Sequence, residues 1–515
     1  MVAGGQGHVL QLAMDMQLKR EIRTHVIWAI LAVLSLVGLY FSTRLVNLTI
    51  IPIFTDEAIY LRWGQIALAD PRWRFISLLD GKQPLLIWLF LPALKLIADP
   101  LVAGRMVSIF AGCMGMIGMG FLGYSLSKNF KTAVVASSLY ILIPFFLVYD
   151  RLAIYDSLFT AISIWTLFLT YWLAKKQRLD LALLVGSAIG VGLLTKSYAQ
   201  FMLILLPLTL LLAPWKKFWP AFLKWLGLSL IVVIQAKVYE SILFLSELRH
   251  NVSDKNLQFI YSWSEFWQHP LDRVFGNLQG LSMWLISYLT IPLSILVAIS
   301  LLWHIKHKWR EGIFFAAYFT VPFLALAFFG KVIYPRFILF MVPPLMVSFI
   351  AFIDYLLKSK FKNVLILLGV VTLVPLVFFD FKLLTDPIHA PLPTADRQQF
   401  INDWPAGYGI PQVVQSLKQE ADKQHVTVGT DGTFGLYPMA LELYLGTNPN
   451  ITFKPYWPLN EFPKDLLEDA KREPTFLLFK EKQTAPSDWP LELIGEYQRG
   501  DGPTYLRFFR VVPKT

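Results

Sequence analysis

Long apolar runs divided by short basic segments dominate this chain and decide what it can fold into. A helix needs about 20 apolar residues to cross a bilayer, and fewer where it packs against neighbours. Eleven runs come close to that length, near residues 25–43, 103–126, 132–149, 157–174, 181–195, 198–214, 221–245, 281–303, 312–330, 337–357 and 364–381. We therefore expect a polytopic α-helical membrane protein with about eleven transmembrane helices.

The composition excludes a soluble globule. Of the 515 residues, 56% are hydrophobic and only 16% are charged, against about 25% charged residues in an average soluble domain. The net charge of +11 comes from basic clusters between the apolar runs, and this distribution orients a membrane protein. We therefore expect contacts with membrane lipid and no nucleic-acid partner. The single cysteine, Cys113, excludes an intrachain disulfide.

One further apolar run, 84–98, decides the topology. It has fifteen residues and contains Pro92 and Lys95. If it does not cross, six basic clusters share the cytoplasmic side, as the positive-inside rule requires. They lie at residues 19–23, 128–131, 175–178, 216–224, 306–310 and 358–362. We therefore interpret 84–98 as an interfacial or re-entrant helix. The chain is then a multi-pass protein of the plasma membrane, with a cytoplasmic N-terminus and an external C-terminal domain.

The chain divides near residue 384. Residues 1–384 hold the apolar runs, with an external loop 1 at 44–100 and an external loop 2 at 149–156. Residues 385–515 instead alternate short strand and helix patterns. Strands are expected at 426–428, 475–479, 491–497 and 505–511, and helices near 411–424, 437–445 and 463–472. This part is expected to be an external soluble α/β domain.

Two acidic residues, Asp56 and Glu57, stand just past the first apolar run. Ionised side chains are costly near hydrocarbon, and those that remain there usually serve function. The alternative is structural, because an acidic pair in the first turn of an interfacial helix caps that helix and favours its dipole. The sequence leaves both interpretations open.

The two loops also carry cations. Loop 1 contains Asp80-Gly81-Lys82-Gln83-Pro84, which places Lys82 at the mouth of the short apolar run 84–98, and loop 2 contains Arg151 and Asp156. A lysine there can simply extend to lipid phosphate, and the arginine and aspartate could neutralise each other. However, so short a loop rarely carries several charges without partners. We therefore expect Arg151 to pair with Glu57 and join the two loops.

Three further cations, Lys196, Lys331 and Arg336, lie at the ends of apolar runs on the same expected side. The simple interpretation is that they are interfacial anchors. Because the positive-inside rule disfavours cations on this side, an anion is expected to hold them, and a lipid phosphate is the simplest one. Carboxylates facing these cations suit a negatively charged lipid headgroup and a reaction at its sugar or phosphate.

The order of these motifs resembles a known family. Asp-Glu follows the first span, Gly-Lys-x-Pro-Leu precedes a short helix, Arg-x4-Asp follows a proline-broken span, and Lys-x2-Tyr-Pro-Arg lies near the late spans. This resembles the GT-C membrane glycosyltransferases, specifically the protein O-mannosyltransferase and aminoarabinose (lipid A) transferase group, often called family 39-like. The resemblance covers roughly residues 20–380, so 1–384 is expected to be a GT-C type transmembrane catalytic domain.

The resemblance implies transfer of a hexose or pentose, with inversion, from a polyprenyl-phosphate carrier to a protein, lipid or glycan acceptor outside the membrane. It assigns catalytic roles to Asp56, Glu57 and Asp156. It assigns the donor phosphate to Lys82, and more loosely to Arg336, Lys331 and Lys196. The bracing of the two loops falls to Arg151 and Glu57. Gln83 departs from the common Lys-Pro-Pro form of the family.

The chemistry leaves several alternatives open. A prenyl phosphate leaves readily and needs charge neutralisation more than a proton. A hydroxyl acceptor needs a base such as Asp56, whereas a phosphate acceptor does not. No cofactor is required, although Asp56, Glu57 and Asp156 could together hold a divalent metal. The rival functions are a lipid-linked sugar flippase or transporter, and an oligosaccharyltransferase that moves a whole glycan. A transporter would carry its charges near the bilayer midplane and often shows two similar halves.

Overall fold

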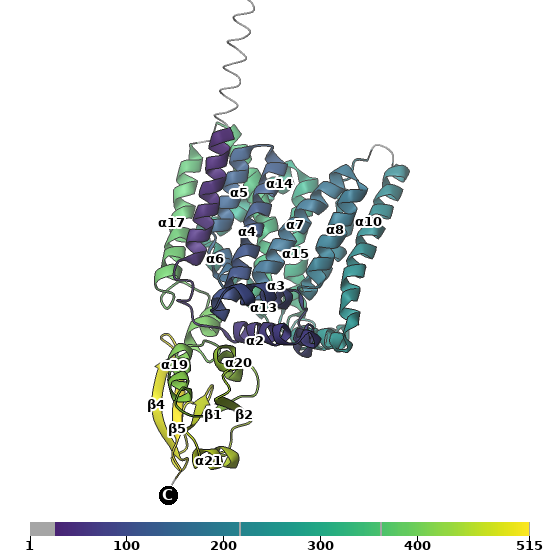
Figure 1. The fold of residues 1–515 in the computed structure, drawn as a ribbon. Coiled ribbons are helices and arrows are strands. Elements are labelled where there is room, and N and C mark those ends of the chain that lie inside the picture. The colour runs from purple at the N-terminus through teal and green to yellow at the C-terminus, as the bar shows by residue number, and fades with distance from the viewer. Residues whose placement is uncertain (1–25, 216–217, 361–362, 514–515) are drawn as a thin grey trace, which may run out of the picture.

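The structure is a computed structural model that describes residues 26–215, 218–360 and 363–513. A bundle of upright helices carries a small sheet domain beyond one of its ends (Figure 1). The basic cluster at 19–23 lies outside the described residues, as do 216–217 and 361–362 of two other clusters. The predicted combination of a helical membrane part and a C-terminal α/β domain is confirmed.

Seven helices in the described ranges are long and apolar enough to cross a membrane. They are Val26–Leu45, α4 (Pro100–Ser127), α7 (Tyr155–Lys176), α10 (Phe218–Glu240, extended to Leu245 by η5), α15 (Trp309–Phe329), η7 with α16 (Pro335–Lys358) and α17 (Val364–Thr385). Two bent pairs raise the number to nine if each is one span. The other two predicted spans correspond to shorter apolar segments, α8 (Leu179–Leu193) and Ser197–Leu212, the latter formed by η3, α9 and η4.

The two bent pairs have local causes. α5 (Phe130–Leu142) and α6 (Pro144–Asp150) meet at 62°, where Pro144 lacks the N–H that a continuous helix would use. α13 (Val274–Leu289) and α14 (Ile291–His307) meet at 107° across Thr290, whose φ is +65°. The predicted span at 281–303 is therefore two helices. α14 stands in the bundle, whereas α13 lies at its end (Figure 1).

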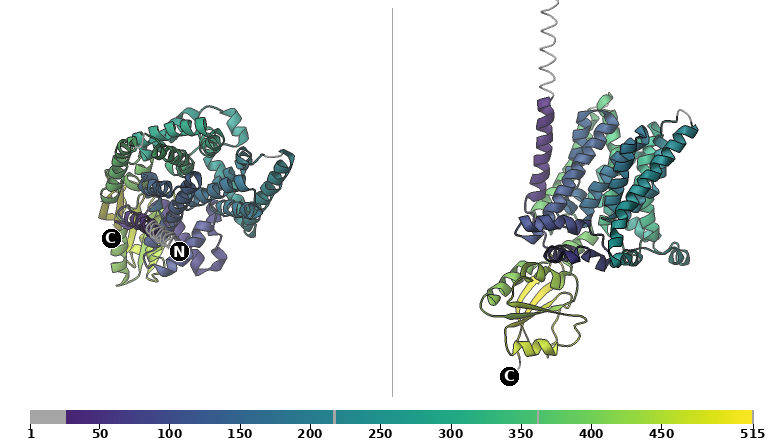
Figure 2. Two further views of the ribbon diagram at one scale, coloured as in Figure 1. Left: turned by 90° about the horizontal axis from the view of Figure 1, so that it is seen from above. Right: turned by 45° about the vertical axis from the view of Figure 1, so that its right-hand side comes forward.

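Short helices cover the end of the bundle that faces the sheet domain. α2 (Thr55–Ala69) and α3 (Leu85–Leu96) lie across this end (Figures 1 and 2). α3 has only twelve residues, too few to cross a bilayer, which agrees with the interfacial interpretation of 84–98. The remaining short helices are η1 (Pro71–Trp73), η2 (Ile76–Asp80), η6 (Glu247–His250), α11 (Asn251–Phe259) and α12 (Trp263–Gln268).

The C-terminal domain is a five-stranded sheet in the order β2-β1-β3-β5-β4. Its strands are β1 (Val426–Asp431), β2 (Ile451–Tyr456), β3 (Thr475–Phe479), β4 (Leu491–Gln498) and β5 (Tyr505–Val511). The first three are mutually parallel, and β5 and β4 add antiparallel pairs. Its helices are α18 (Thr394–Arg397), η8 (Gln398–Asn402), α19 (Ile410–Ala421), α20 (Leu436–Leu445) and α21 (Lys464–Ala470). α19 and α20 lie between the sheet and the bundle, and α21 lies on the far side (Figure 1).

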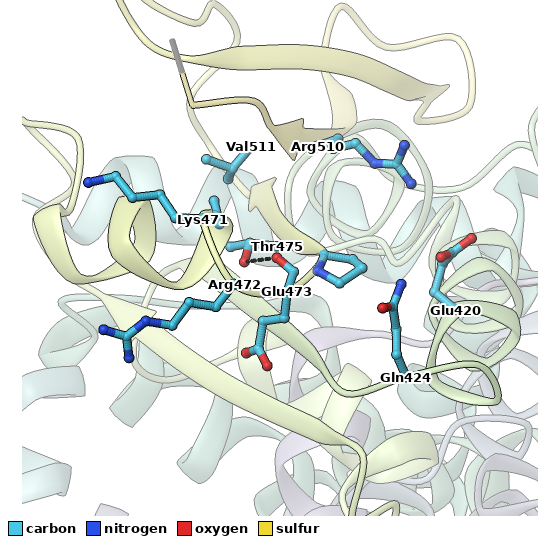
Figure 3. Close-up of a pocket in the computed structure, with 10 residues that line it drawn as sticks. Glu420, Gln424, Lys471, Arg472, Glu473, Thr475, Arg510 and Val511 are labelled. Carbon is cyan, nitrogen blue, oxygen red and sulfur yellow. Dashed lines mark hydrogen bonds between the residues drawn. The ribbon is translucent and has the colours of Figure 1, made fainter. Parts of the chain in front are cut away.

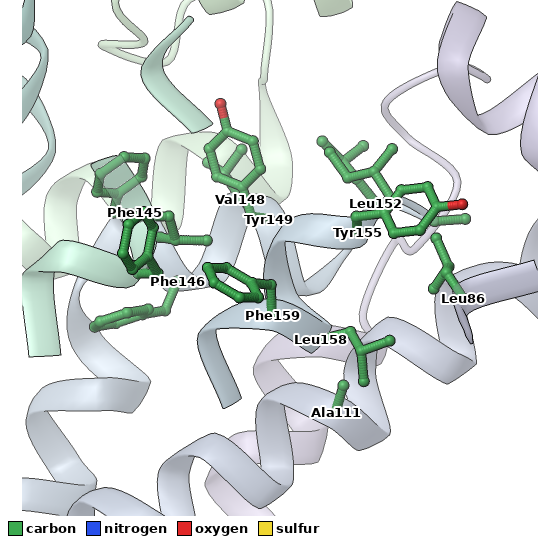
Figure 4. Close-up of a cluster of buried hydrophobic side chains, with 14 of the residues drawn as sticks. Leu86, Ala111, Phe145, Phe146, Val148, Tyr149, Leu152, Tyr155, Leu158 and Phe159 are labelled. Carbon is green, nitrogen blue, oxygen red and sulfur yellow. The ribbon is translucent and has the colours of Figure 1, made fainter. Parts of the chain in front are cut away.

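Successive side chains of β3 point to opposite faces of the sheet and join two different hydrophobic cores. Phe476 and Leu478 join the large core that continues into the membrane part, whereas Leu477 and Phe479 pack with α21 in a separate cluster. A second dense region surrounds loop 2, where aromatic side chains of α6 and α7 pack around the turn between them (Figure 4). Arg151, on the turn between these helices, and Asp156, in the first turn of α7, are therefore embedded in the protein.

Candidate active site

A cavity of about 690 Å³ lies at the end of the bundle that carries α2 and α3. Its wall includes the turn at residues 81–83, the start of α7, the segment 195–204, parts of α11 and α15, and η7 (Pro335–Met341). Most lining side chains are apolar or aromatic, and four are cationic: Lys82, Lys196, Lys255 and Arg336. A pocket of this size and lining can enclose a sizeable amphiphilic ligand.

Three of the four cations have a carboxylate partner. Arg336 donates to Asp56 at 2.7 Å, and Lys196 donates to Asp156 at 2.6 Å. The third pair, between Lys255 and Asp80, is also 2.6 Å long. The structure thus brings Asp56, Asp156, Lys196 and Arg336 together, as the motifs predicted.

Lys82 differs from the other three cations. Within the described ranges, no carboxylate lies within 4 Å of its ammonium, which instead faces the Phe259 ring at 5.3 Å from the centroid. Burial lowers the pKa of Lys82 to about 8, while Asp56 and Asp80 oppose this shift and Arg336 and Lys255 add to it. Four cations against three carboxylates leave one excess positive charge. The cavity is therefore suited to a single negative charge beside Lys82.

Asp56 lies in the first turn of α2, and its side chain is 22% exposed. Its Oδ2 accepts from Arg336 and, at 3.4 Å, from the Tyr60 hydroxyl. Burial pushes the pKa of Asp56 upward, but Arg336, Lys82 and Lys196 bring it below its usual value. The carboxylate is thus ionised at neutral pH, and its other oxygen, Oδ1, makes no hydrogen bond in the structure. It can accept a proton from a bound group.

Glu57 does not pair with Arg151, so this prediction is wrong. Its carboxylate is fully buried and forms a two-pronged ion pair with Arg105 of α4, with both N···O distances at 2.8 Å. The same carboxylate accepts the backbone N–H of Phe54 at 3.0 Å and of Ala153 at 2.7 Å. These four bonds occupy both oxygens, so the catalytic role expected of Glu57 does not fit. Glu57 is instead the residue that caps α2, and through Ala153 it still joins loop 1 to loop 2.

Arg151 braces a different element. Its guanidinium donates to the backbone carbonyls of Thr43, Arg44, Val46 and Asn47, at distances of 2.7–3.1 Å. Those carbonyls end the first membrane helix, where a helix leaves its last C=O groups without partners. Arg151 thus fixes loop 2 to the start of loop 1, as predicted, although Glu57 is not its partner.

Lys331 is not part of the cavity wall, contrary to prediction. Its ammonium pairs with Glu265 of α12 at 2.7 Å and donates to the Leu257 carbonyl at 3.0 Å. Lys255 and Arg105 take places that sequence reasoning missed. Arg105 carried a usable signal, because a charge inside an apolar run such as 103–126 normally has a buried partner. Lys255 carried none, since it stands in a polar stretch without a clear period.

The C-terminal domain contacts the helix that carries Asp56. The Pro405 carbonyl accepts both the backbone N–H and the hydroxyl of Thr55, each at 3.1 Å. Further along α2, Arg62 pairs with Glu442 of α20 at 3.0 Å. The N-terminal turn of α2 is thus held on one side by the C-terminal domain and on the other by the membrane helices.

Asp56, Glu57 and Asp156 each pair with a different cation and do not converge. Among the described residues, no three acidic, histidine or cysteine side chains come together as metal ligands.

A second hollow, of about 460 Å³, lies on the C-terminal domain between α19, α21 and β5 (Figure 3). It contains Glu420, Glu473 and Arg510 but none of the residues that line the larger cavity.

Comparisons with known proteins bear on the fold. The family model described as dolichyl-phosphate-mannose-protein mannosyltransferase matches residues 82–239. Among solved structures, ArnT from Cupriavidus metallidurans bound to undecaprenyl phosphate has a TM-score of 0.62 at 13% identity, covering 94% of this chain and 98% of that chain. The chain has the GT-C fold. The same ArnT in the apo state has a TM-score of 0.58 at 12% identity, covering 95% and 98%. No curated protein matches the sequence.

The GT-C fold confirms the resemblance drawn from the motifs and makes the chain a multi-pass membrane protein. The family match begins at Lys82 and includes Asp156 and Lys196. Asp56 and Arg336 lie outside the matched residues. Their place in the site rests on the geometry of this structure.

Proposed function

We propose that the protein is an inverting glycosyltransferase that moves a sugar from a polyprenyl-phosphate carrier to an acceptor on the external side of the membrane. The observation that carries this proposal is Lys82, a half-buried cation with no carboxylate within 4 Å in the described ranges, in a largely apolar cavity whose Arg336 pairs with the ionised Asp56. The cavity suits a prenyl chain and the lysine suits its phosphate. The GT-C fold and the family match at residues 82–239 support the same reaction class.

The proposed reaction is a single displacement. An acceptor oxygen attacks the anomeric carbon from the side opposite the phosphate, and the bond from that carbon to the phosphate oxygen breaks. The phosphate leaves with the bonding electrons, and the Lys82 ammonium, with Arg336 nearby, stabilises its charge. Where the acceptor is a hydroxyl, Asp56 takes its proton. One displacement at the anomeric carbon inverts its configuration.

The rival functions fit the charges less well. A transporter places ionisable residues on broken helices near the bilayer midplane, whereas the cations here gather at one end of the bundle, beside α2. Transfer of a whole glycan in the oligosaccharyltransferase manner would require several carboxylates around a divalent metal. Asp56, Glu57 and Asp156, the carboxylates expected to hold such a metal, each pair with a separate cation.

Lys82→Met is expected to weaken the affinity for a polyprenyl phosphate about tenfold or more, because the unpaired cation is removed. Native mass spectrometry or a lipid-binding titration of the purified protein measures this directly. Lys331→Met is the matched control, since Lys331 lies outside the cavity and pairs with Glu265. Equal affinities for the two variants would remove Lys82 from the donor site and withdraw the main support for the proposal.

The same lysine sets an expected pH dependence. With a pKa of about 8, Lys82 is charged below that pH and loses its charge above it. Donor affinity should therefore be constant up to about pH 7 and fall as the pH rises through 8. Lys82→Arg should flatten the profile, because an arginine stays protonated throughout. An unchanged slope in that variant would assign the dependence to another group.

The external placement of the C-terminal domain is part of the proposal. Thr433 is exposed on a loop of that domain, and the single native cysteine, Cys113, is buried. A Thr433→Cys variant on a Cys113→Ala background should react with an impermeant thiol reagent added to intact cells. Protection in intact cells with labelling only after lysis would place the domain in the cytoplasm.

A further inference from the structure

Cationic and aromatic side chains that the proposed reaction does not use gather at the carboxyl ends of β1 and β3. The rim of the C-terminal sheet at these strand ends is called this edge below. β1 lies between β2 and β3, and all three strands are parallel. The chain leaves β1 toward β2 on one side and later returns to β3 on the other. In open α/β sheets, ligands bind at the carboxyl ends of the strands where the strand order reverses in this way. Here those ends are Asp431 of β1 and Phe479 of β3.

Asp431 organises this edge. Its Oδ2 accepts the backbone N–H groups of Lys480, Glu481 and Lys482 at 3.3–3.4 Å, which fixes the loop after β3 against the end of β1. Gly432 follows with a φ of +121°, and a Cβ placed there would lie 3.6 Å from the Lys480 ammonium. The lysine side chain therefore folds over this turn and is held at the edge.

Lys480 stands between two indole rings. Its ammonium lies 4.6 Å from the ring centroid of Trp404 and 5.5 Å from that of Trp457, and 3.1 Å from a Glu481 oxygen. Lys480 is only 7% exposed, whereas Trp457 is 60% exposed. An exposed indole beside a nearly buried cation offers a flat apolar face next to a positive charge.

A second cation lies behind this lysine. Arg499 is fully buried, and one of its nitrogens donates to the Lys480 carbonyl at 2.9 Å. Among the described residues, its Nε and Nη1 make no close hydrogen bond, and its polar neighbours include the buried Tyr437 hydroxyl and the carboxylates of Asp403 and Glu481. In the part of the chain that the structure describes, no carboxylate lies within 4 Å of this guanidinium. Asp403 and Glu481 offset part of this buried charge without touching it, and a bound anion would satisfy the guanidinium directly.

This edge also lies beside the proposed catalytic residue. Trp404 immediately precedes Pro405, whose carbonyl binds Thr55. A Cβ on Gly435, three residues after Gly432, would lie 3.6 Å from the Thr55 side chain. Thr55 in turn precedes Asp56. A ligand on this edge would therefore lie on the side of α2 that faces the C-terminal domain.

We propose that this edge binds a negatively charged sugar of the acceptor, with a phosphate or carboxylate group near Lys480 and Arg499 and the sugar ring against Trp457. The inference rests on the proposed function, because a sugar placed here becomes an acceptor only if Asp56 serves transfer. Binding of the sugar itself needs no donor and no catalysis. A result against sugar binding at this edge can thus be told apart from a result against the transferase function.

The test is a calorimetric titration of the full-length protein in nanodiscs with glucose 6-phosphate, glucose and inorganic phosphate. The Lys82→Met background removes the anion site of the larger cavity. We expect glucose 6-phosphate to bind this background, and Trp457→Ala and Lys480→Met to weaken binding about tenfold or more. Lys471→Met, on an exposed lysine of the same domain paired with Glu468, should have no effect.

Each result of the titration either supports or overturns the proposal. Trp457 is on the surface, so Trp457→Ala tests the site even if Lys480→Met disturbs the loop. No binding, or binding that survives both substitutions, would overturn the proposal. Equal binding of glucose would overturn its charge requirement, and equal binding of inorganic phosphate would overturn the contact between sugar ring and indole.

Discussion

Replacing Asp56 with asparagine is expected to lower turnover about a hundredfold or more, while folding and donor binding persist. The ionised carboxylate interacts with both Lys82 and Arg336, and among the described residues its Oδ1 accepts no hydrogen bond. Asparagine has the same shape but accepts no proton. Measuring turnover with donor and acceptor, together with donor affinity and thermal stability, separates the catalytic loss from a structural one.

Asp70→Asn is the matched control for this substitution. Asp70 ends the same helix and pairs with Arg72, whose side chain is 89% exposed. This control should remain close to wild type in turnover, because exposed pairs contribute little. A fully active Asp56→Asn enzyme would show that the acceptor needs no base or that another group supplies it.

Replacing Glu57 with glutamine is expected to destabilise the protein by about 3–5 kcal/mol, because it leaves the Arg105 guanidinium as an unpaired buried charge. Both side chains of the pair are 0% exposed. Thermal unfolding in detergent measures this loss of stability, with unfolding monitored as the loss of monodisperse protein on a sizing column. Arg105→Gln should have a similar effect, and the double variant should be little worse than either single one, since contacting partners are not additive.

Arg151 provides the comparison for this pair. Arg151→Gln removes bonds to backbone carbonyls but touches no oxygen of Glu57. The coupling energy between Glu57 and Arg105 should therefore exceed that between Glu57 and Arg151. A larger coupling energy between Glu57 and Arg151 than between Glu57 and Arg105 would support the pairing expected from the sequence.

The sequence predicted the membrane helices better than it predicted the pairings of the charged side chains. Hydropathy and charge identify spans because lipid and membrane orientation act on each segment separately. The partner of Glu57 depends on how α4 packs against α2, and no local pattern encodes that. Arg151 and Arg105 lie close enough to interact electrostatically, and tertiary packing alone decides which of them meets Glu57.

The sequence analysis missed the strand β2 and the partner of Lys331 for similar reasons. The strand at 451–456 contains Lys454 and Pro455, which weaken the alternation expected of a strand. Pro455 is tolerated because β2 lies at the edge of the sheet. Lys331 was assigned to the donor because cations are disfavoured on the external side, but Glu265, from an aromatic stretch without a clear period, satisfies it locally.

For the proposed transferase, the single excess positive charge of the cavity bears on how fast a prenyl carrier can be released. A sugar-linked prenyl phosphate carries one negative charge, whereas the free prenyl phosphate left after transfer carries close to two at pH 7. Lys82 should therefore hold the spent carrier more tightly than the loaded one. Departure of the carrier, rather than transfer of the sugar, would then limit steady turnover. A rapid-mixing experiment should show this as a burst of one product per protein, and a linear onset would indicate that chemistry is slower than release.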